Sequence, residues 1–73
     1  MTVIFDAKTL KSKRKHLKLT QAMLAEKADT SERYIRSLET HKKRNPSAKL
    51  VFQLSKVLRV PMEDLMTVQE EDA

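Results

Sequence analysis

Apolar residues recur along the chain at intervals of three and four positions, the spacing that places side chains on one face of an α-helix. The segment that runs to about Leu58 contains more apolar residues than one helix face can hold. Leu50, Phe52 and Val57 are therefore expected to lie outside its core-facing side. The residues expected to face the core are Leu10, the aliphatic stem of Arg14, and Leu17; Leu24, Ala25 and Ala28; Ile35 and Leu38; and Ala48, Val51, Leu54, Ser55 and Leu58.

Residues that favour helix N-termini stand before each of these segments. Phe5 and Leu10 also have the spacing of a hydrophobic staple around the first helix start. A basic polar stretch from Thr40 to Asn45 has no periodicity and is predicted to be a loop. The predicted helices are 7–17 capped by Asp6, 21–28 capped by Thr20, 31–39 capped by Thr30 or Ser31, a fourth from Pro46-Ser47 to about Leu58, and a short turn or helix after Pro61 that carries Leu65.

The composition agrees with a helical chain and removes several kinds of site. Among 73 residues there is no glycine and no cysteine, and the two prolines are at positions 46 and 61. The lack of glycine excludes glycine-rich phosphate loops and the usual hairpin turns. The lack of cysteine excludes disulfides and thiolate metal sites, and the two histidines have no partner spacing for a metal. We therefore predict an all-α domain with no metal and no cofactor.

The charge of the chain favours an anionic partner. Fifteen Lys and Arg against ten Asp and Glu give a net charge of +5, and three of the acidic residues lie at positions 70–72. A compact basic body favours nucleic acid, or with less support an anionic membrane surface. No apolar run approaches the length of a membrane span, and the residues before Asp6 are too few for a signal peptide. A cytoplasmic location is expected.

The second and third predicted helices are separated by only two or three residues. Their apolar residues would pack the two helices on each other through a tight turn, with Ala25 small where the backbones approach. The free face of the third helix carries Glu32, Arg33, Arg36 and Ser37. This arrangement predicts a helix-turn-helix, whose second helix enters the major groove of DNA.

The same region resembles the Xre/Cro-type helix-turn-helix family, to which the amino-terminal domains of lambdoid phage repressors belong. Residues 19–28 read LTQAMLAEKA and are followed by Ser31, by Ile35 and Leu38-Glu39, and by Asn45-Pro46-Ser47. The resemblance spans about residues 8–66. It implies a compact five-helix, lambda-repressor-like domain that binds double-stranded operator DNA, usually as a homodimer. We place this domain at residues 1–67 and expect residues 68–73 to be an acidic, disordered tail.

Several residues match positions where family members contact bases or phosphates. Arg33 suits the guanine edge, and the Glu32 carboxylate can accept from cytosine N4. Glu32 has a second interpretation, in which it holds Arg33 or Arg36 in place. Ser31 caps the helix and can also touch DNA, while Ser37 occupies a deeper groove position. The remaining DNA-binding candidates are Gln21, which would contact a phosphate and brace the first residue of the third helix, Tyr34 and Arg36 as phosphate contacts, and Lys42, Lys43, Arg44 and Asn45 as a phosphate clamp.

Two further features concern architecture. Arg14 and Glu39 resemble a family pair that joins the first helix to the end of the third, and both fall near apolar faces where an unpaired charge is costly. The chain departs from the family pattern at Asp29 and His41, where glycine is common. Asp tolerates left-handed backbone better than most residues, so the turn at Asp29 is expected to survive.

These observations predict a sequence-specific transcription regulator, and more specifically a repressor that binds a palindromic operator as a dimer. One alternative is an antitoxin or another protein-interaction module, in which Leu50, Phe52 or the acidic tail would matter more than the third helix. A restriction-modification controller protein is a variant of the first interpretation. No set of acid, base and nucleophile has a catalytic spacing, so neither an enzyme nor a small-molecule substrate is expected.

Overall fold

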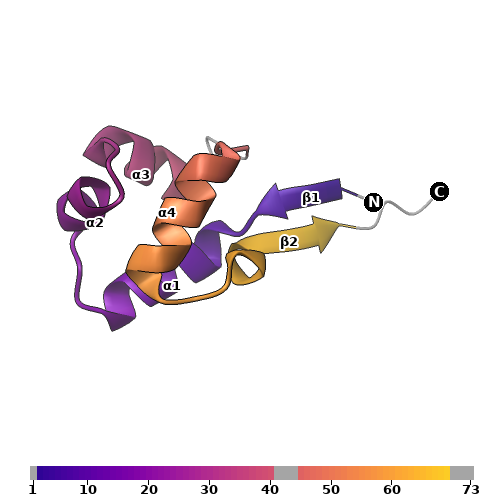
Figure 1. The fold of residues 1–73 in the computed structure, drawn as a ribbon, viewed down its shortest axis with the longest axis horizontal. Coiled ribbons are helices and arrows are strands. Elements are labelled where there is room, and N and C mark those ends of the chain that lie inside the picture. Colours follow the sequence, from indigo (N-terminus) through magenta and orange to yellow (C-terminus); the bar gives the residue numbers. More distant parts are fainter. Residues whose placement is uncertain (1, 41–44, 70–73) are drawn as a thin grey trace.

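The protein, seen here as a computed structural model, is described for residues 2–40 and 45–69 (Figure 1). A bundle of short helices forms one end of the molecule, and a two-stranded ribbon extends from the other. In chain order the elements are β1 (Thr2–Phe5), α1 (Ala7–His16), α2 (Gln21–Lys27), α3 (Glu32–Glu39), α4 (Ala48–Leu58), the 3₁₀-helix η1 (Met62–Leu65) and β2 (Met66–Gln69).

The mostly helical, lambda-repressor-like fold is confirmed, but the expected count of five helices is not, and a two-stranded ribbon is added. Within the described ranges there are four α-helices, and the predicted fifth is the single 3₁₀ turn η1. β1 and β2 pair antiparallel, with Thr2 opposite Gln69 and Phe5 opposite Met66. The boundary expected between residues 67 and 68 falls inside β2, so Val68 and Gln69 belong to the fold. Residues 70–73, the rest of the predicted acidic tail, lie outside the described residues.

The predicted helix starts are confirmed, because each one is fixed by a local hydrogen bond. The side chains of Asp6, Thr20, Ser31 and Ser47 each accept from a backbone amide three residues later, over 3.0–3.1 Å. Ser31, rather than Thr30, caps α3. Asp29 adopts a φ of 58°, the left-handed geometry expected of it in the turn before α3.

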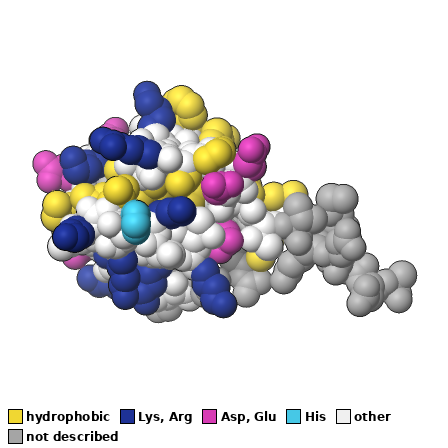
Figure 2. Space-filling view, turned by 90° about the horizontal axis from the view of Figure 1, so that it is seen from below, with side chains coloured by type: hydrophobic (Ala, Val, Ile, Leu, Met, Phe, Trp, Pro, Cys, Tyr) yellow, Lys and Arg dark blue, Asp and Glu magenta, His cyan; other side chains and the backbone are white. Residues whose placement is uncertain are grey.

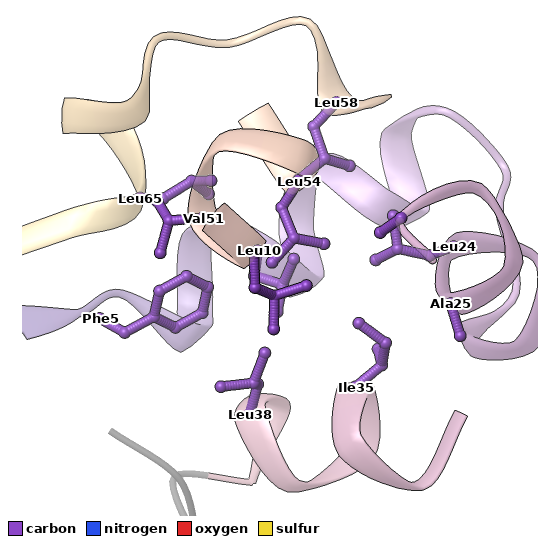
Figure 3. Close-up of a cluster of buried hydrophobic side chains, with 12 residues drawn as sticks. Phe5, Leu10, Leu24, Ala25, Ile35, Leu38, Val51, Leu54, Leu58 and Leu65 are labelled. Atoms are coloured by element: carbon purple, nitrogen blue, oxygen red, sulfur yellow. The ribbon is translucent and has the colours of Figure 1, made fainter. Parts of the chain in front are cut away.

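One hydrophobic cluster joins all four α-helices to η1 and the end of β1 (Figure 3). The staple residues Phe5 and Leu10 are both part of it, 4% and 0% exposed. Three predictions about facing were wrong. Leu17 is 37% exposed because α1 ends at His16, and on α4 Leu50 is buried whereas Ala48 is exposed. The inward row of α4 therefore includes Leu50, Val51, Leu54 and Leu58.

Asp6 joins the first helix to the ribbon, and its removal is expected to weaken both. Its carboxylate accepts from the Thr9 amide (3.1 Å), the Thr9 hydroxyl (2.8 Å) and the Thr67 hydroxyl of β2 (3.1 Å). Partial burial acts to raise the pKa of Asp6, but these hydrogen bonds outweigh burial and hold the pKa below its ordinary value of 3.8. Since loss of an N-cap costs about 1–2 kcal/mol, Asp6→Ala should lower the free energy of unfolding by that amount at pH 7.

The same pKa shift gives this prediction a pH signature. A carboxyl group whose pKa is lower in the folded state stabilises the fold above its unfolded pKa, and the contribution is lost as the pH falls through the folded pKa. The difference between wild type and Asp6→Ala should therefore shrink below pH 3.8. Urea denaturation at a series of pH values measures it, with Asp6→Asn as the control that keeps a capping oxygen. Identical pH dependence of wild type and Asp6→Ala would contradict the assignment.

Candidate nucleic-acid interface

The α2–α3 pair is built as a tight helix-turn-helix. The Thr30 amide donates to the Ala25 carbonyl over 2.9 Å, which closes the turn after the left-handed Asp29. Ile35 and Leu38, both fully buried, fix α3 against the core by one face. The opposite face of α3 is thereby presented to solvent, at the top of the molecule in Figure 1.

This outward face carries the residues that were expected to reach DNA. Glu32, Arg33 and Arg36 are all exposed. A Glu32 oxygen lies 3.6 Å from an Arg36 nitrogen one turn later. This contact agrees with the second interpretation of Glu32, in which it holds a neighbouring arginine in place. The Ser37 hydroxyl donates to the Arg33 carbonyl over 3.0 Å. The geometry thus leaves the Arg33 guanidinium exposed on the outward side of α3.

A buried ion pair holds the end of α3 to the rest of the bundle. The Arg14 Nε and Nη2 groups donate to the two carboxylate oxygens of Glu39, over 2.6 and 3.0 Å. Arg14 Nη1 also donates to the Leu19 carbonyl in the α1–α2 connection, over 2.8 Å. The side chains of Arg14 and Glu39 are 10% and 2% exposed. The ion pair expected from the sequence is therefore present and almost completely shielded from solvent.

Gln21 takes part in this network in a way that differs from the expectation. Its side-chain amide donates to Glu39 Oε1 over 3.2 Å, and so it braces the last residue of α3 rather than the first. The geometry follows from Gln21 being the first residue of α2, next to the C-terminal end of α3. In this position the residue is half-buried.

Two of the remaining candidates, Tyr34 on α3 and Asn45 before α4, belong to the described residues. Tyr34 is half-buried against the core, and Asn45 is exposed. The predicted clamp residues Lys42, Lys43 and Arg44, like His41, fall outside the described residues. The sequence reasoning missed Lys49 and Gln53, which line a depression of about 270 Å³ together with Tyr34. The signal available in the sequence was their spacing of four after the Ser47 cap, which places them on neighbouring turns of one side of α4.

Two further findings concern membrane spans and metal ligands. No helix in the described part of the chain is both long and apolar enough to span a bilayer. Within residues 2–40 and 45–69, no three histidine, aspartate or glutamate side chains are grouped so that they could hold a metal ion.

A capped helix, a left-handed turn and a second helix with an exposed polar face define a helix-turn-helix protein. The chain belongs to the Xre/Cro-like helix-turn-helix family, whose family model matches residues 10–65. No curated protein sequence matches it significantly.

Solved structures give the same fold. One of them is SinR from Bacillus subtilis, the master regulator for biofilm formation, solved in complex with DNA. Its sequence is 32% identical, and the TM-score is 0.77 over 81% of this chain and 97% of that chain. The restriction-modification controller protein C.AhdI from Aeromonas hydrophila is 22% identical, with a TM-score of 0.75 over 81% and 88% of the two chains. HppE in complex with substrate is 20% identical, with a TM-score of 0.75 over 84% of this chain and 34% of that chain. The last two show a shared fold only.

Proposed function

We infer that this protein is a DNA-binding transcription regulator that reads sequence with α3. The observation that carries the proposal is the outward row on α3, where Glu32, Arg33 and Arg36 are exposed on a helix whose other face is fully buried. The similarity to SinR, a regulator solved in complex with DNA, supports the same assignment. Such a helix fits the major groove, where each base pair presents a distinct set of donors and acceptors.

We assign the residues to two roles. Arg33 and Ser37 contact base edges, and Glu32 orients Arg36 while it penalises base pairs that offer it no donor. Phosphate contacts fix the protein on the duplex and supply most of the affinity, which makes binding strongly dependent on salt. The residues proposed for phosphate contacts are Gln21, Ser31, Tyr34, Arg36, Lys42, Lys43, Arg44 and Asn45. We propose Lys49 with them, because it lines the same depression as Tyr34.

The proposed mode of action is repression by occupancy. A homodimer with two-fold symmetry would present two α3 helices to half-sites about 10 bp apart on one face of the duplex. Occupying such an operator blocks access of RNA polymerase to an overlapping promoter. Selection of bound duplexes from a random DNA pool tests the two-fold arrangement, because a dimer must return a palindromic consensus.

Arg33→Ala is the substitution that tests the recognition helix. Loss of a bidentate contact to guanine costs about 1–3 kcal/mol, so binding to the selected operator should weaken by about 5- to 150-fold. The loss should be confined to sites that carry the preferred base at one position of each half-site. Fluorescence anisotropy with the consensus and single-base variants measures it.

Arg36→Ala is the matched control, since it removes the same charge from the same helix. A phosphate contact carries no sequence information, so this variant should weaken binding to all duplexes alike and reduce the salt dependence. If Arg33→Ala binds consensus and variant duplexes in the wild-type ratio, Arg33 does not read a base. Salt-sensitive binding of all duplexes alike by the wild type would favour the alternative of a protein-interaction module.

A further inference from the structure

A groove on the far side of the molecule from α3 has no part in the proposed DNA contact. It has a volume of about 450 Å³ and is lined by Leu17, Leu19, Lys27, Lys56, Val57 and Arg59. In Figure 1 the α1–α2 connection and the C-terminal end of α4 lie at the bottom of the molecule, while α3 lies at the top. Figure 2, which views the molecule from below, shows hydrophobic side chains among lysine and arginine side chains.

The groove combines an apolar floor with a cationic rim. Leu17 is 37% exposed, and Leu19 and Val57 are half-buried against the edge of the core. The exposed side chains of Lys27 and Arg59 stand at the ends of α2 and α4. No acidic side chain contributes to this lining in the part of the chain that the structure describes. The lining therefore combines apolar surface with three positively charged side chains.

An exposed aromatic ring continues the apolar surface along α4. Phe52 is 51% exposed, and the Lys56 Nζ lies 5.4 Å from the centre of its ring. Phe52 and Lys56 lie one turn apart on the surface of α4, and Arg59 follows as the C-cap of the helix. A ligand in the groove can reach these side chains without approaching α3.

The backbone at Arg59 carries a charged side chain where glycine would fit with less strain. Arg59 is the C-cap of α4 and has φ 59° and ψ 42°, the left-handed region that favours glycine. Its cationic side chain is thus held at a conformational cost at the rim of the groove. This cost makes Arg59 a position where the charge can be removed without harming the fold.

We propose that the groove binds an acidic, amphipathic peptide segment of a partner protein. Leucine-like side chains of the segment cover the apolar floor, and its carboxylates pair with the three cations of the rim. A DNA backbone fits this surface less well, because phosphates would face the apolar floor without covering it. Since the groove and α3 lie on opposite sides of the molecule, the peptide and the operator can bind at the same time.

The test uses the whole chain and a short fluorescent peptide in which leucine recurs at helical spacing and glutamate fills most other positions. Binding is followed by anisotropy, and the site is mapped by changes in the backbone amide NMR signals. We expect the signals of Leu17, Leu19 and Val57 to shift and those of α3 to stay in place. Two comparison peptides replace glutamate with lysine or leucine with serine, and both should bind weakly.

Arg59→Gly supplies the sharpest variant. Glycine relieves the left-handed strain, so the melting temperature should equal or exceed that of wild type. Peptide affinity should fall by about fivefold, as expected for one ion pair at a partly desolvated rim, while operator affinity stays unchanged. Lys8→Gln on α1 is the control, because it removes the same unit of charge away from the groove.

Each alternative outcome overturns the proposal. If the peptide without leucine binds as well as the parent, or Lys8→Gln weakens binding as much as Arg59→Gly, the attraction is general electrostatics. If duplex DNA shifts the NMR signals of the groove residues and competes with the peptide, the cationic rim binds the phosphate backbone of DNA and not a peptide. If no signal in the groove responds to the acidic peptide, the groove is no peptide site. None of these results bears on the reading of DNA by α3.

Discussion

Replacing Arg14 with alanine is expected to lower the free energy of unfolding by about 3–5 kcal/mol, the cost of leaving a buried charge without its partner. The Glu39 side chain is 2% exposed, so the variant leaves a largely buried carboxylate without the guanidinium that it binds. The Leu19 carbonyl loses its donor from Arg14 as well. A domain of this length has a total stability of only about 4–11 kcal/mol, and the variant should approach the limit of folding. Urea denaturation at pH 7 measures the effect.

A double substitution separates the value of the pair from the cost of breaking it. Arg14→Met combined with Glu39→Leu removes both charges and keeps apolar volume, so it should recover most of the stability lost in the single variant. Arg36→Ala is the matched control, since it breaks an exposed pair with Glu32 and should cost less than about 1 kcal/mol. A loss below about 1 kcal/mol in Arg14→Ala would mean that water solvates the Glu39 carboxylate in the variant.

Leu65→Ala is expected to cost about 2–5 kcal/mol, the usual range for a fully buried leucine. Leu65 is 0% exposed, and the 3₁₀-helix that carries it packs against both α1 and α4. Its carbonyl accepts from the Asp6 amide over 2.7 Å, so the same residue joins the start of α1 to the end of the chain. Thermal denaturation should show a lower melting temperature in a single transition.

Met62→Ala is the matched control for this prediction. Met62 belongs to the same 3₁₀-helix but is 37% exposed, so its truncation should change stability by much less. Equal effects of the two substitutions would mean that η1 frays as a unit and does not anchor the core. A small effect of Leu65→Ala alone would show that the helices fold without support from the segment after Pro61.

The helices could be predicted from the sequence because their signals are local. A cap such as Thr20 or Ser31 bonds an amide three residues away, and Ile35 and Leu38 lie one turn apart. The Arg14–Glu39 pair, which joins residues 25 positions apart, was predicted through the family resemblance and the cost of an unpaired charge near an apolar face. The caps and the apolar spacing are therefore local signals, whereas the ion pair needed the comparison with a family pattern.

The ribbon could not be predicted because its information is not local. Each strand has only four residues, and Thr2 pairs with Gln69 across nearly the whole chain. Neither segment alone is long enough to show alternation, and no turn sequence joins them. The prediction that Leu17 faces the core was wrong for a different reason. The helix ends at His16, one residue earlier than the periodicity suggested, so Leu17 lies outside it.

At the candidate site, the residue types on α3 were predictable but their partners were not. The choice of Arg36 as the contact of Glu32 rests on a spacing of four that the sequence contains, whereas Gln21 meets Glu39 only because α2 and α3 cross. Lys49 and Gln53 were missed because their relation to Tyr34 depends on how α4 returns past α3. The roles of these residues toward DNA stay predictions until the variants are measured.

The pairing of Thr2 with Gln69 places two positions that are far apart in the sequence side by side. A short linker between these two positions would close the backbone into a circle, and the chain could then be opened in a surface loop to give a circularly permuted protein. The same geometry means that a fluorescent tag or a second domain attached next to Thr2 or Gln69 would lie at the ribbon, away from α3 (Figure 1). Two copies joined in tandem through these positions would therefore be connected through their ribbons, and the outward faces of both α3 helices would stay exposed.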